Sequence, residues 1–135
     1  MSDEPYVATF NPDQLKAEAA VRKAANAGNP EAQFRLGVMY GNGDGVALNH
    51  ATAVEWFEKA AAQGHDNALI TLAWMFANGT GVEVDEQRAR ELYLAAAERG
   101  SAKAQYVVAT MFRFAQYGVS KDIEKAVHWY LEAAN

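Results

Sequence analysis

The chain has 135 residues, of which half are hydrophobic and 21% are charged, and its net charge is −5. This length and composition predict one soluble globular domain. The acidic balance and the scattered Lys and Arg residues argue against binding to nucleic acid, which requires basic residues gathered on one surface.

Cysteine is absent from the sequence, so disulfides, thiol nucleophiles and thiolate metal ligands are excluded. This composition fits a reducing compartment. The N-terminal residues MSDEPYVATF are acidic where a signal peptide is basic, and no apolar run approaches the length that spans a bilayer. We therefore expect a cytoplasmic protein that does not contact a membrane.

The N-terminal part of the chain precedes the first full repeat. Residues 1–10 show no periodicity and are predicted to form a tail. Segment 11–28 begins with Asn11 as a candidate helix cap and Pro12 at the first helical position. It ends in AANAG, which is similar to the KAAAQG that ends a later helix. We therefore expect a lone helix here, equivalent to the second helix of a repeat.

Three copies of one pattern occupy the rest of the chain. Residues 29–64 and 65–100 match without a gap, and a third copy fills 101–135 with one extra residue in its loop. A fixed period of this length indicates a repeat architecture. In the first copy the recurring residues are Ala32, Leu36, Met39, Tyr40, Gly43, Gly45, Val46, Ala53, Phe57, Ala60, Ala61 and Gly64.

The spacing of the recurring residues predicts two helices in each repeat. Ala32, Leu36, Met39 and Tyr40 fall at i, i+4, i+7 and i+8, which is one face of a helix, and the residues from Ala53 onward follow the same pattern. We call these the first and the second helix of the repeat. Apolar residues that recur at helical spacing usually serve packing, so we interpret them as core.

A glycine-containing loop joins the two helices of each repeat. Its sequence is GNGDGV, GTGV or YGV, and a short polar residue that can cap the second helix follows: Asn49, Asp85 or Asp122. In the third copy Ala115 and Tyr117 stand nearest to the positions of the loop glycines. We therefore expect this loop to be reshaped.

The repeat resembles that of the Sel-one-like repeat family, a relative of the tetratricopeptide repeats. The family pattern has Ala, Leu-Gly and Tyr on the first helix, G-x-G-V in the loop, and Ala, Trp-Tyr and Ala-Ala on the second; the match covers residues 11–135. The resemblance implies an all-α fold, a right-handed α/α superhelix of about seven helices. It also implies a protein-protein adaptor, often bacterial. Cysteine-rich members are associated with penicillin-like ligands and cell-wall fragments, but their paired cysteines are missing here.

The binding surface is predicted on first-helix positions that the repeat leaves free. If the first helices line the concave side, as in related solenoids, the positions i, i+4, i+7 and i+11 form a groove for a protein or peptide. Trp74 is the strongest candidate because tryptophan is typical of binding hot spots, although it could equally cover a neighbouring helix. The predicted partner-binding residues are Glu31, Arg35, Val38, Asn42, Asn67, Thr71, Trp74, Asn78, Lys103, Val107, Thr110 and Phe114.

The sequence shows no catalytic, cofactor-binding or metal-binding constellation. His50, His65 and His128 lack the i, i+4 spacing of a helical metal site, and there is no nucleophile elbow or phosphate-binding loop. We therefore expect a non-enzymatic binding module with no cofactor. The alternatives are a dedicated inhibitor or immunity protein for one enzyme or toxin, a cell-wall hydrolase, and a purely structural, oligomer-forming unit.

The sequence stops at Asn135, before the glycine that would close the last helix. Apolar side chains among Val127, Trp129, Tyr130 and Leu131 are then expected to be exposed. This suggests a homodimer through the C-terminal end or a fragment of a longer repeat protein; alternatively, the last helix caps itself.

Overall fold

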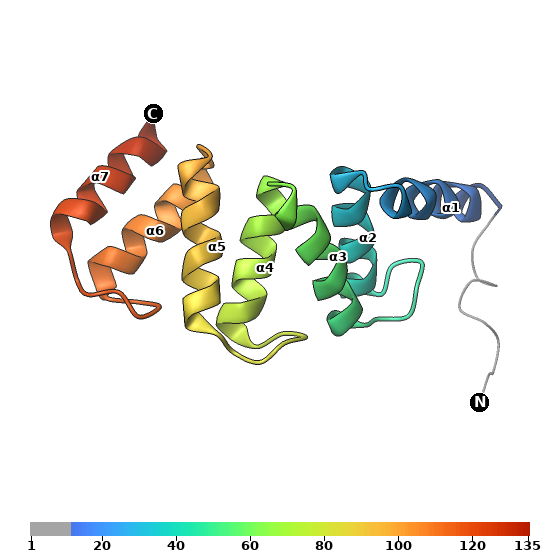
Figure 1. The fold of residues 1–135 in the computed structure, drawn as a ribbon, viewed down its shortest axis with the longest axis horizontal. Helices are drawn as coiled ribbons and strands as arrows, with labels where there is room; N and C mark the ends of the chain where they lie inside the picture. The colour runs from blue at the N-terminus through green and yellow to red at the C-terminus, as the bar shows by residue number, and fades with distance from the viewer. Residues whose placement is uncertain (1–11) are drawn as a thin grey trace. The chain divides into compact units, whose positions relative to one another are not determined.

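A computed structural model describes residues 12–135, and within these residues it contains seven α-helices and no strand (Figure 1). The all-α prediction is therefore confirmed. The predicted tail at 1–10 and the Asn11 cap lie outside the described residues. The helices are α1 (Pro12–Asn26), α2 (Pro30–Asn42), α3 (His50–Ala62), α4 (Asp66–Asn78), α5 (Glu86–Glu98), α6 (Ala102–Phe114) and α7 (Ile123–Ala134).

The helices group into two compact units. Unit 1 contains α1, α2 and α3 and ends at His65, and unit 2 runs from Asp66 through α4, α5, α6 and α7. In unit 1, α2 packs against both α1 and α3. In unit 2, α5 packs against α4 and α6, and α6 also packs against α7. The first helices of the three repeats are thus α2, α4 and α6, and α1 stands as a second helix before α2.

Polar side chains cap the second helix of every repeat and the first helix of the first and third repeats. Asn49, Asp85 and Asp122 each accept a hydrogen bond from the backbone N–H three residues further on, at 3.0, 3.0 and 3.1 Å. Asn29 and Ser101 do the same for α2 and α6. Because these bonds satisfy N–H groups that the helix leaves free, they fix where each helix begins.

The core is formed by positions that recur between repeats. Gly37 of α2 illustrates the packing, because a Cβ atom there would lie only 2.6 Å from Cε1 of Phe57 on α3. The small residue therefore lets α2 and α3 approach closely. Fully or almost fully buried positions shared by the three repeats include Leu36, Leu72 and Val108 on the first helices and Ala53, Ala89 and Ala126 on the second helices.

The loop between α6 and α7 begins with the same backbone conformation as the glycine loops and then contains an extra turn. Gly43 ends α2 with φ of 67°, and its N–H donates to the last turn of that helix. Ala115 ends α6 in the same way with φ of 53°, and Tyr117 also has a positive φ of 52°. The expected reshaping is therefore wrong for the start of the loop. The extra residue is accommodated in a turn in which the Val119 N–H donates to the Gln116 carbonyl at 3.2 Å.

Helix α7 leaves an apolar stripe uncovered in unit 2. Ile123, Val127 and Leu131 are 51%, 49% and 62% exposed. Trp129 and Tyr130 are half-buried. The expected exposure at the C-terminal end therefore applies to Val127 and Leu131, and much less to the two aromatic residues.

Candidate protein-binding surface

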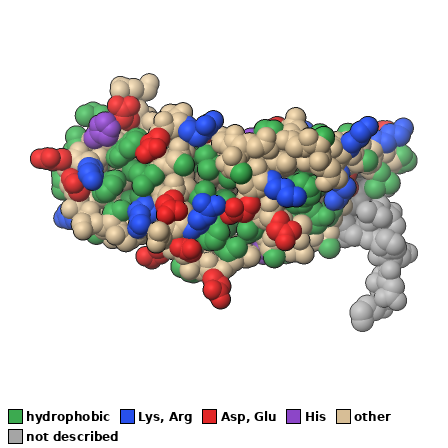
Figure 2. Space-filling view, viewed as in Figure 1, with side chains coloured by type: hydrophobic (Ala, Val, Ile, Leu, Met, Phe, Trp, Pro, Cys, Tyr) green, Lys and Arg blue, Asp and Glu red, His purple; other side chains and the backbone are tan. Residues whose placement is uncertain are grey.

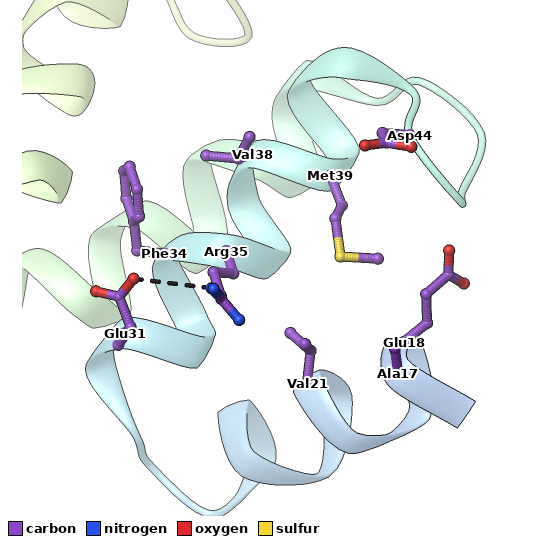
Figure 3. A pocket seen from close by; sticks show the side chains of 9 residues that line it. All are labelled: Ala17, Glu18, Val21, Glu31, Phe34, Arg35, Val38, Met39 and Asp44. Atoms are coloured by element: carbon purple, nitrogen blue, oxygen red, sulfur yellow. Dashed lines mark ion pairs between the residues drawn. The ribbon is translucent and has the colours of Figure 1, made fainter. Parts of the chain in front are cut away.

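A hollow of about 490 Å³ lies between α1 and α2 in unit 1 (Figure 3). Its apolar lining consists of Ala17 and Val21 from α1 and Phe34, Val38 and Met39 from α2. Figure 3 shows Val21 and Met39 pointing toward each other from the two helices. Its volume falls within the range of surface pockets that bind ligands.

The hollow exists because α1 carries a small side chain where later second helices carry an aromatic one. Val21 precedes Phe57 by 36 residues and Tyr93 by 72 residues, so all three hold the same position of the repeat. Phe57 and Tyr93 are only 3% and 4% exposed and fill the space around them. Met39, beside Val21, is only half-buried, whereas its counterpart Met111 is fully buried.

Four charged side chains stand around this apolar lining. Figure 3 shows Glu18 and Asp44 at one end and Glu31 and Arg35 at the other. Arg35 Nε lies 3.8 Å from Glu31 Oε1, and both side chains are about two-thirds exposed (66% and 63%). Such a solvated pair contributes little to stability. With three carboxylates and one guanidinium, the rim carries net negative charge.

The Glu31 carboxylate is further positioned by His65. The His65 Nε2 atom lies 2.7 Å from Glu31 Oε2, and the imidazole ring stacks on Phe34 with the ring centroids 4.8 Å apart. One histidine therefore links the charged rim of the hollow to its aromatic lining.

Glu18 reaches from α1 to the loop that follows α2. Gly45 in this loop is buried and has φ of 81°, and a Cβ atom there would overlap the Glu18 carboxylate. Glycine adopts this left-handed backbone without strain, and its lack of a side chain leaves room for the Glu18 carboxylate. The acidic end of the hollow is thus fixed jointly by α1 and the loop.

In unit 1 the structure brings three of the four predicted binding residues together. Glu31, Arg35 and Val38 line the hollow, because the i, i+4 and i+7 positions share one face of α2. Asn42 is exposed at the end of α2 and is not part of the lining.

In unit 2 the predicted residues of α4 include an exposed tryptophan, Trp74. Trp74 is 53% exposed, so about half of its surface is available for contact. Asn67 is exposed and Thr71 is half-buried. The side-chain amide of Asn78 donates to the Trp74 carbonyl at 2.8 Å, which engages that amide with the helix itself.

The predicted residues of α6 also share one face. Lys103 is exposed, Val107 and Thr110 are half-buried, and Phe114 is 58% exposed. The guanidinium carbon of Arg113 lies 4.8 Å from the centre of the Phe114 ring, a cation-π contact. Charged and aromatic groups are therefore in contact on the surface of this helix.

Sequence reasoning missed three residues of this face: Tyr106, Arg113 and Tyr130. Tyr106 is 60% exposed and packs edge-on against Tyr130, with the ring centroids 5.5 Å apart. Tyr106 and Arg113 follow Lys103 by three and ten residues, which places them on the same side of the helix. The predicted stripe was limited to the i, i+4, i+7 and i+11 positions and therefore did not include Tyr106 or Arg113. Tyr130 could not be predicted without knowing how α7 packs on α6.

Tyr130 joins α7 to this face through polar contacts. Its hydroxyl lies 3.4 Å from Thr110 Oγ1, and Thr110 Oγ1 donates to the Tyr106 carbonyl at 2.9 Å. Hydrogen bonding to Thr110, and next to Arg113, lowers the pKa of Tyr130 below its ordinary value. The arrangement therefore favours an orientation of the phenol toward α6.

Residues 12–135 contain no group of three or more His, Cys, Asp or Glu side chains that could hold a metal ion. His50 and His128 are exposed, and His65 is engaged with Glu31. In this part of the chain, no helix has the length and apolar character that crossing a bilayer requires. What these residues do offer is the apolar hollow of unit 1 and the aromatic face of α6.

Three Sel1 repeats are recognised in the sequence, at residues 30–65, 67–101 and 102–135. The chain belongs to the Sel1 repeat family. The resemblance inferred from the repeated residues is therefore confirmed. Sel1-repeat proteins generally act as non-catalytic scaffolds that mediate protein–protein interaction. A comparison with curated proteins gave no significant match.

Solved structures of other Sel1-repeat proteins are similar to this chain. A protective antigen of uropathogenic Escherichia coli with an SLR fold is 35% identical over 84% of this chain and 24% of its own, with a TM-score of 0.80. A Sel1 repeat protein from Oxalobacter formigenes is 38% identical over 88% of this chain and 48% of its own, with a TM-score of 0.82. The chain thus spans about a quarter and about half of these two proteins. The cysteine-rich protein B of Helicobacter pylori, 20% identical with a TM-score of 0.66, shares the fold.

Proposed function

We propose that this Sel1-repeat chain is a non-catalytic module that binds a protein or peptide on the exposed faces of its first helices, α2, α4 and α6. The hollow between α1 and α2 is the observation that carries the proposal. It combines an apolar lining with a charged rim, and hot spots of protein interfaces commonly consist of an apolar or aromatic anchor in such a pocket.

The hollow supports binding of an apolar side chain from the partner. Full burial of a large apolar side chain contributes roughly 1.5 to 3 kcal/mol, so one anchor in the hollow would dominate a small interface. Arg35 and Glu31 on its rim are exposed and able to pair with polar groups beside the anchor. Trp74, half-exposed on α4, provides a second anchor in unit 2.

The proposal is tested by capture of partners from the native cell lysate with the purified chain, followed by mass spectrometry. The wild type is compared with an Arg35→Ala, Val38→Ala variant of the hollow and with Trp74→Ala. Val84→Ala is the matched control, because Val84 is 59% exposed but lies outside the three first helices. Circular dichroism checks that all variants keep their helices.

We expect at least one protein to be retained by the wild type and by Val84→Ala but lost with the hollow variant. A partner lost only with Trp74→Ala would move the main contact to α4. Retention of the same partner by every variant would contradict binding through the first helices, and retention of none by the wild type would contradict the binding function.

A further inference from the structure

Two acidic positions of the α1–α2 junction in unit 1 are held by cations at the α5–α6 junction of unit 2. Lys103 follows Glu31 by 72 residues, and Arg90 follows Glu18 by 72 residues, so each pair holds one position of the repeat. At both positions a carboxylate in unit 1 is replaced by a cation in unit 2. The same scaffold thus presents opposite charge at two junctions.

Arg90 and Glu18 also occupy the same place in the structure. Glu18 of α1 lies against Gly45 in the loop that follows α2. Arg90 of α5 lies against the loop that follows α6, where its NH1 atom donates to the Tyr117 carbonyl at 2.7 Å. In both cases a side chain of a second helix supports the next loop, so the reversal concerns equivalent sites.

The α5–α6 junction differs from the hollow in shape as well. Tyr93 is buried where α1 has Val21, and its ring stacks on Tyr117 with the centroids 5.9 Å apart. In unit 2 this aromatic pair occupies the space that corresponds to the hollow of unit 1. A partner would therefore lie across the exposed surface of α6, which we call the α6 platform and define by Lys103, Tyr106, Arg113 and Phe114.

This platform is rich in cations and aromatic rings. Lys103, Tyr106, Arg113 and Phe114 are all exposed, and α6, with the sequence AKAQYVVATMFRF, contains no Asp or Glu. Neither Lys103 nor Arg113 forms an ion pair with a carboxylate among residues 12–135. No carboxylate of this part of the chain therefore neutralises these charges, and Arg113 contacts only the Phe114 ring and the Tyr130 side chain in the interactions described above.

The acidic residues of the neighbouring helix α7 point elsewhere. Glu132 is two residues from Tyr130 and thus on the opposite side of α7, and Glu124 is six residues away, roughly 120° around the helix. Tyr130 contacts α6 through the Tyr106 ring and the Thr110 hydroxyl. The platform thus forms a local positive surface on a chain whose net charge is −5.

We propose that the α6 platform, made of Lys103, Tyr106, Arg113 and Phe114, binds an acidic peptide segment in which carboxylates flank an aromatic or large aliphatic residue. The inference rests on the proposed function in taking a first helix as the binding surface, and it names the partner chemistry there. Carboxylates pair with Lys103 and Arg113, and the apolar side chain packs on the Tyr106 and Phe114 rings.

The test is a titration of the purified, ¹⁵N-labelled chain with two synthetic peptides, Ac-EDWLED-NH2 and its charge-reversed counterpart Ac-KRWLKR-NH2. We expect the acidic peptide to shift the backbone amides of Tyr106, Arg113 and Phe114. Lys103→Glu with Arg113→Glu should weaken this binding about tenfold or more, because like charges then face each other. Lys16→Glu with Lys23→Glu on α1 is the matched control, with both lysines exposed, and should change the Kd less than about twofold.

Three results would overturn the proposal: no shift in α6 with the acidic peptide, equal shifts with the basic peptide, or equal weakening by the control variant. Because the titration uses purified protein and defined peptides, a negative result leaves the lysate capture through the hollow unaffected. A failed capture likewise leaves the result of the titration at α6 intact.

Discussion

At the scale of single residues, the glycines with positive φ differ in what surrounds them. Gly28 and Gly45 have φ of 100° and 81°. A Cβ at Gly28 would meet nothing within 4 Å, whereas a Cβ at Gly45 would overlap the Glu18 carboxylate. Backbone strain and side-chain contact can therefore be separated experimentally with two substitutions in unit 1.

We predict that Gly45→Ala destabilises the protein more than Gly28→Ala. Both variants pay roughly 1 to 3 kcal/mol for an alanine in the left-handed region. Only Gly45→Ala must also displace Glu18. Urea unfolding measures the free energy of unfolding of each variant, and Glu18→Ala in the Gly45→Ala background should restore part of the loss. Equal losses for the two glycine variants would show that the contact with Glu18 costs nothing.

We predict a loss of stability at alkaline pH that depends on Tyr93. Burial, and to a lesser extent the nearby Tyr117, raises the pKa of Tyr93 to about 12 from the ordinary value of 10.0. Since the unfolded chain loses this proton first, the stabilising effect is complete below pH 10 and is lost as the pH rises through 12. The raised pKa corresponds to a loss of about 2 to 3 kcal/mol in the free energy of unfolding over this pH range.

Tyr93→Phe removes the ionisable group and keeps the ring. The free energy of unfolding of this variant, measured by urea between pH 8 and pH 12, should fall less steeply than that of the wild type. Tyr106→Phe removes the same atom from a residue that is 60% exposed and serves as the control. Identical pH profiles for Tyr93→Phe and wild type would refute the role of burial.

At the scale of elements, the loop after α6 shows an alanine in a position that glycine holds in the other repeats. Gly43 and Gly79 have φ of 67° and 71°, and Ala115 follows them with φ of 53°. An L-residue in this region is strained by roughly 1 to 2 kcal/mol. The hydrogen bonds that begin the loop nevertheless match those of the earlier repeats.

We predict that Ala115→Gly stabilises the protein by about 0.5 kcal/mol, because relief of strain exceeds the added freedom of glycine in the unfolded chain. Thermal and urea unfolding provide the measurement. Ala20→Gly in the exposed part of α1 has the opposite expectation, a loss of about 1 kcal/mol, because glycine is unfavourable within a helix. A destabilised Ala115→Gly variant would mean that the alanine side chain makes a favourable contact.

The repeat made the helices predictable to a large extent. Recurring apolar positions such as Leu36 and the caps such as Asn49 act locally, and one period constrains the other copies. The geometry at Ala115 could not be predicted in this way. Propensity disfavours a left-handed alanine, and the hydrogen bonds of the loop and the stacking of Tyr117 on Tyr93 override that preference.

The candidate surface was less predictable than the helices. The spacing of residues along α2 correctly predicted that Glu31, Arg35 and Val38 share one helix face, and all three line the hollow. It could not find Glu18 or Val21, since they come from another helix and their contribution depends on how α1 packs on α2. Residues that share one face of one helix can therefore be predicted from their spacing. A surface formed between two helices can be identified only once the packing of those helices is known.

At the scale of the whole molecule, we propose that two copies associate through the exposed stripe of α7. Ile123, Val127 and Leu131 follow one another at four-residue spacing and are each about half exposed or more. The free energy gained by burying these side chains is opposed by roughly 4 to 15 kcal/mol for the translational and rotational freedom lost on association. We therefore expect a weak dimer that is populated only at high protein concentration.

Light scattering coupled to size exclusion should therefore give a mass that rises with protein concentration. Val127→Lys with Leu131→Lys should remain monomeric. Leu48→Lys changes a side chain that is 59% exposed in unit 1 and should leave the association unchanged. A constant monomer mass for the wild type up to millimolar concentration would refute self-association.

The hollow lies at a junction between the second helix of one repeat and the first helix of the next, and the α6 platform lies on a first helix beside such a junction. Duplication or deletion of one 36-residue block would leave the remaining helices and their buried alanine and leucine positions unchanged. It would nevertheless bring a new pair of helices together and create a surface that neither parent sequence had. Recombination at repeat boundaries can therefore diversify recognition in such a chain without a single point substitution.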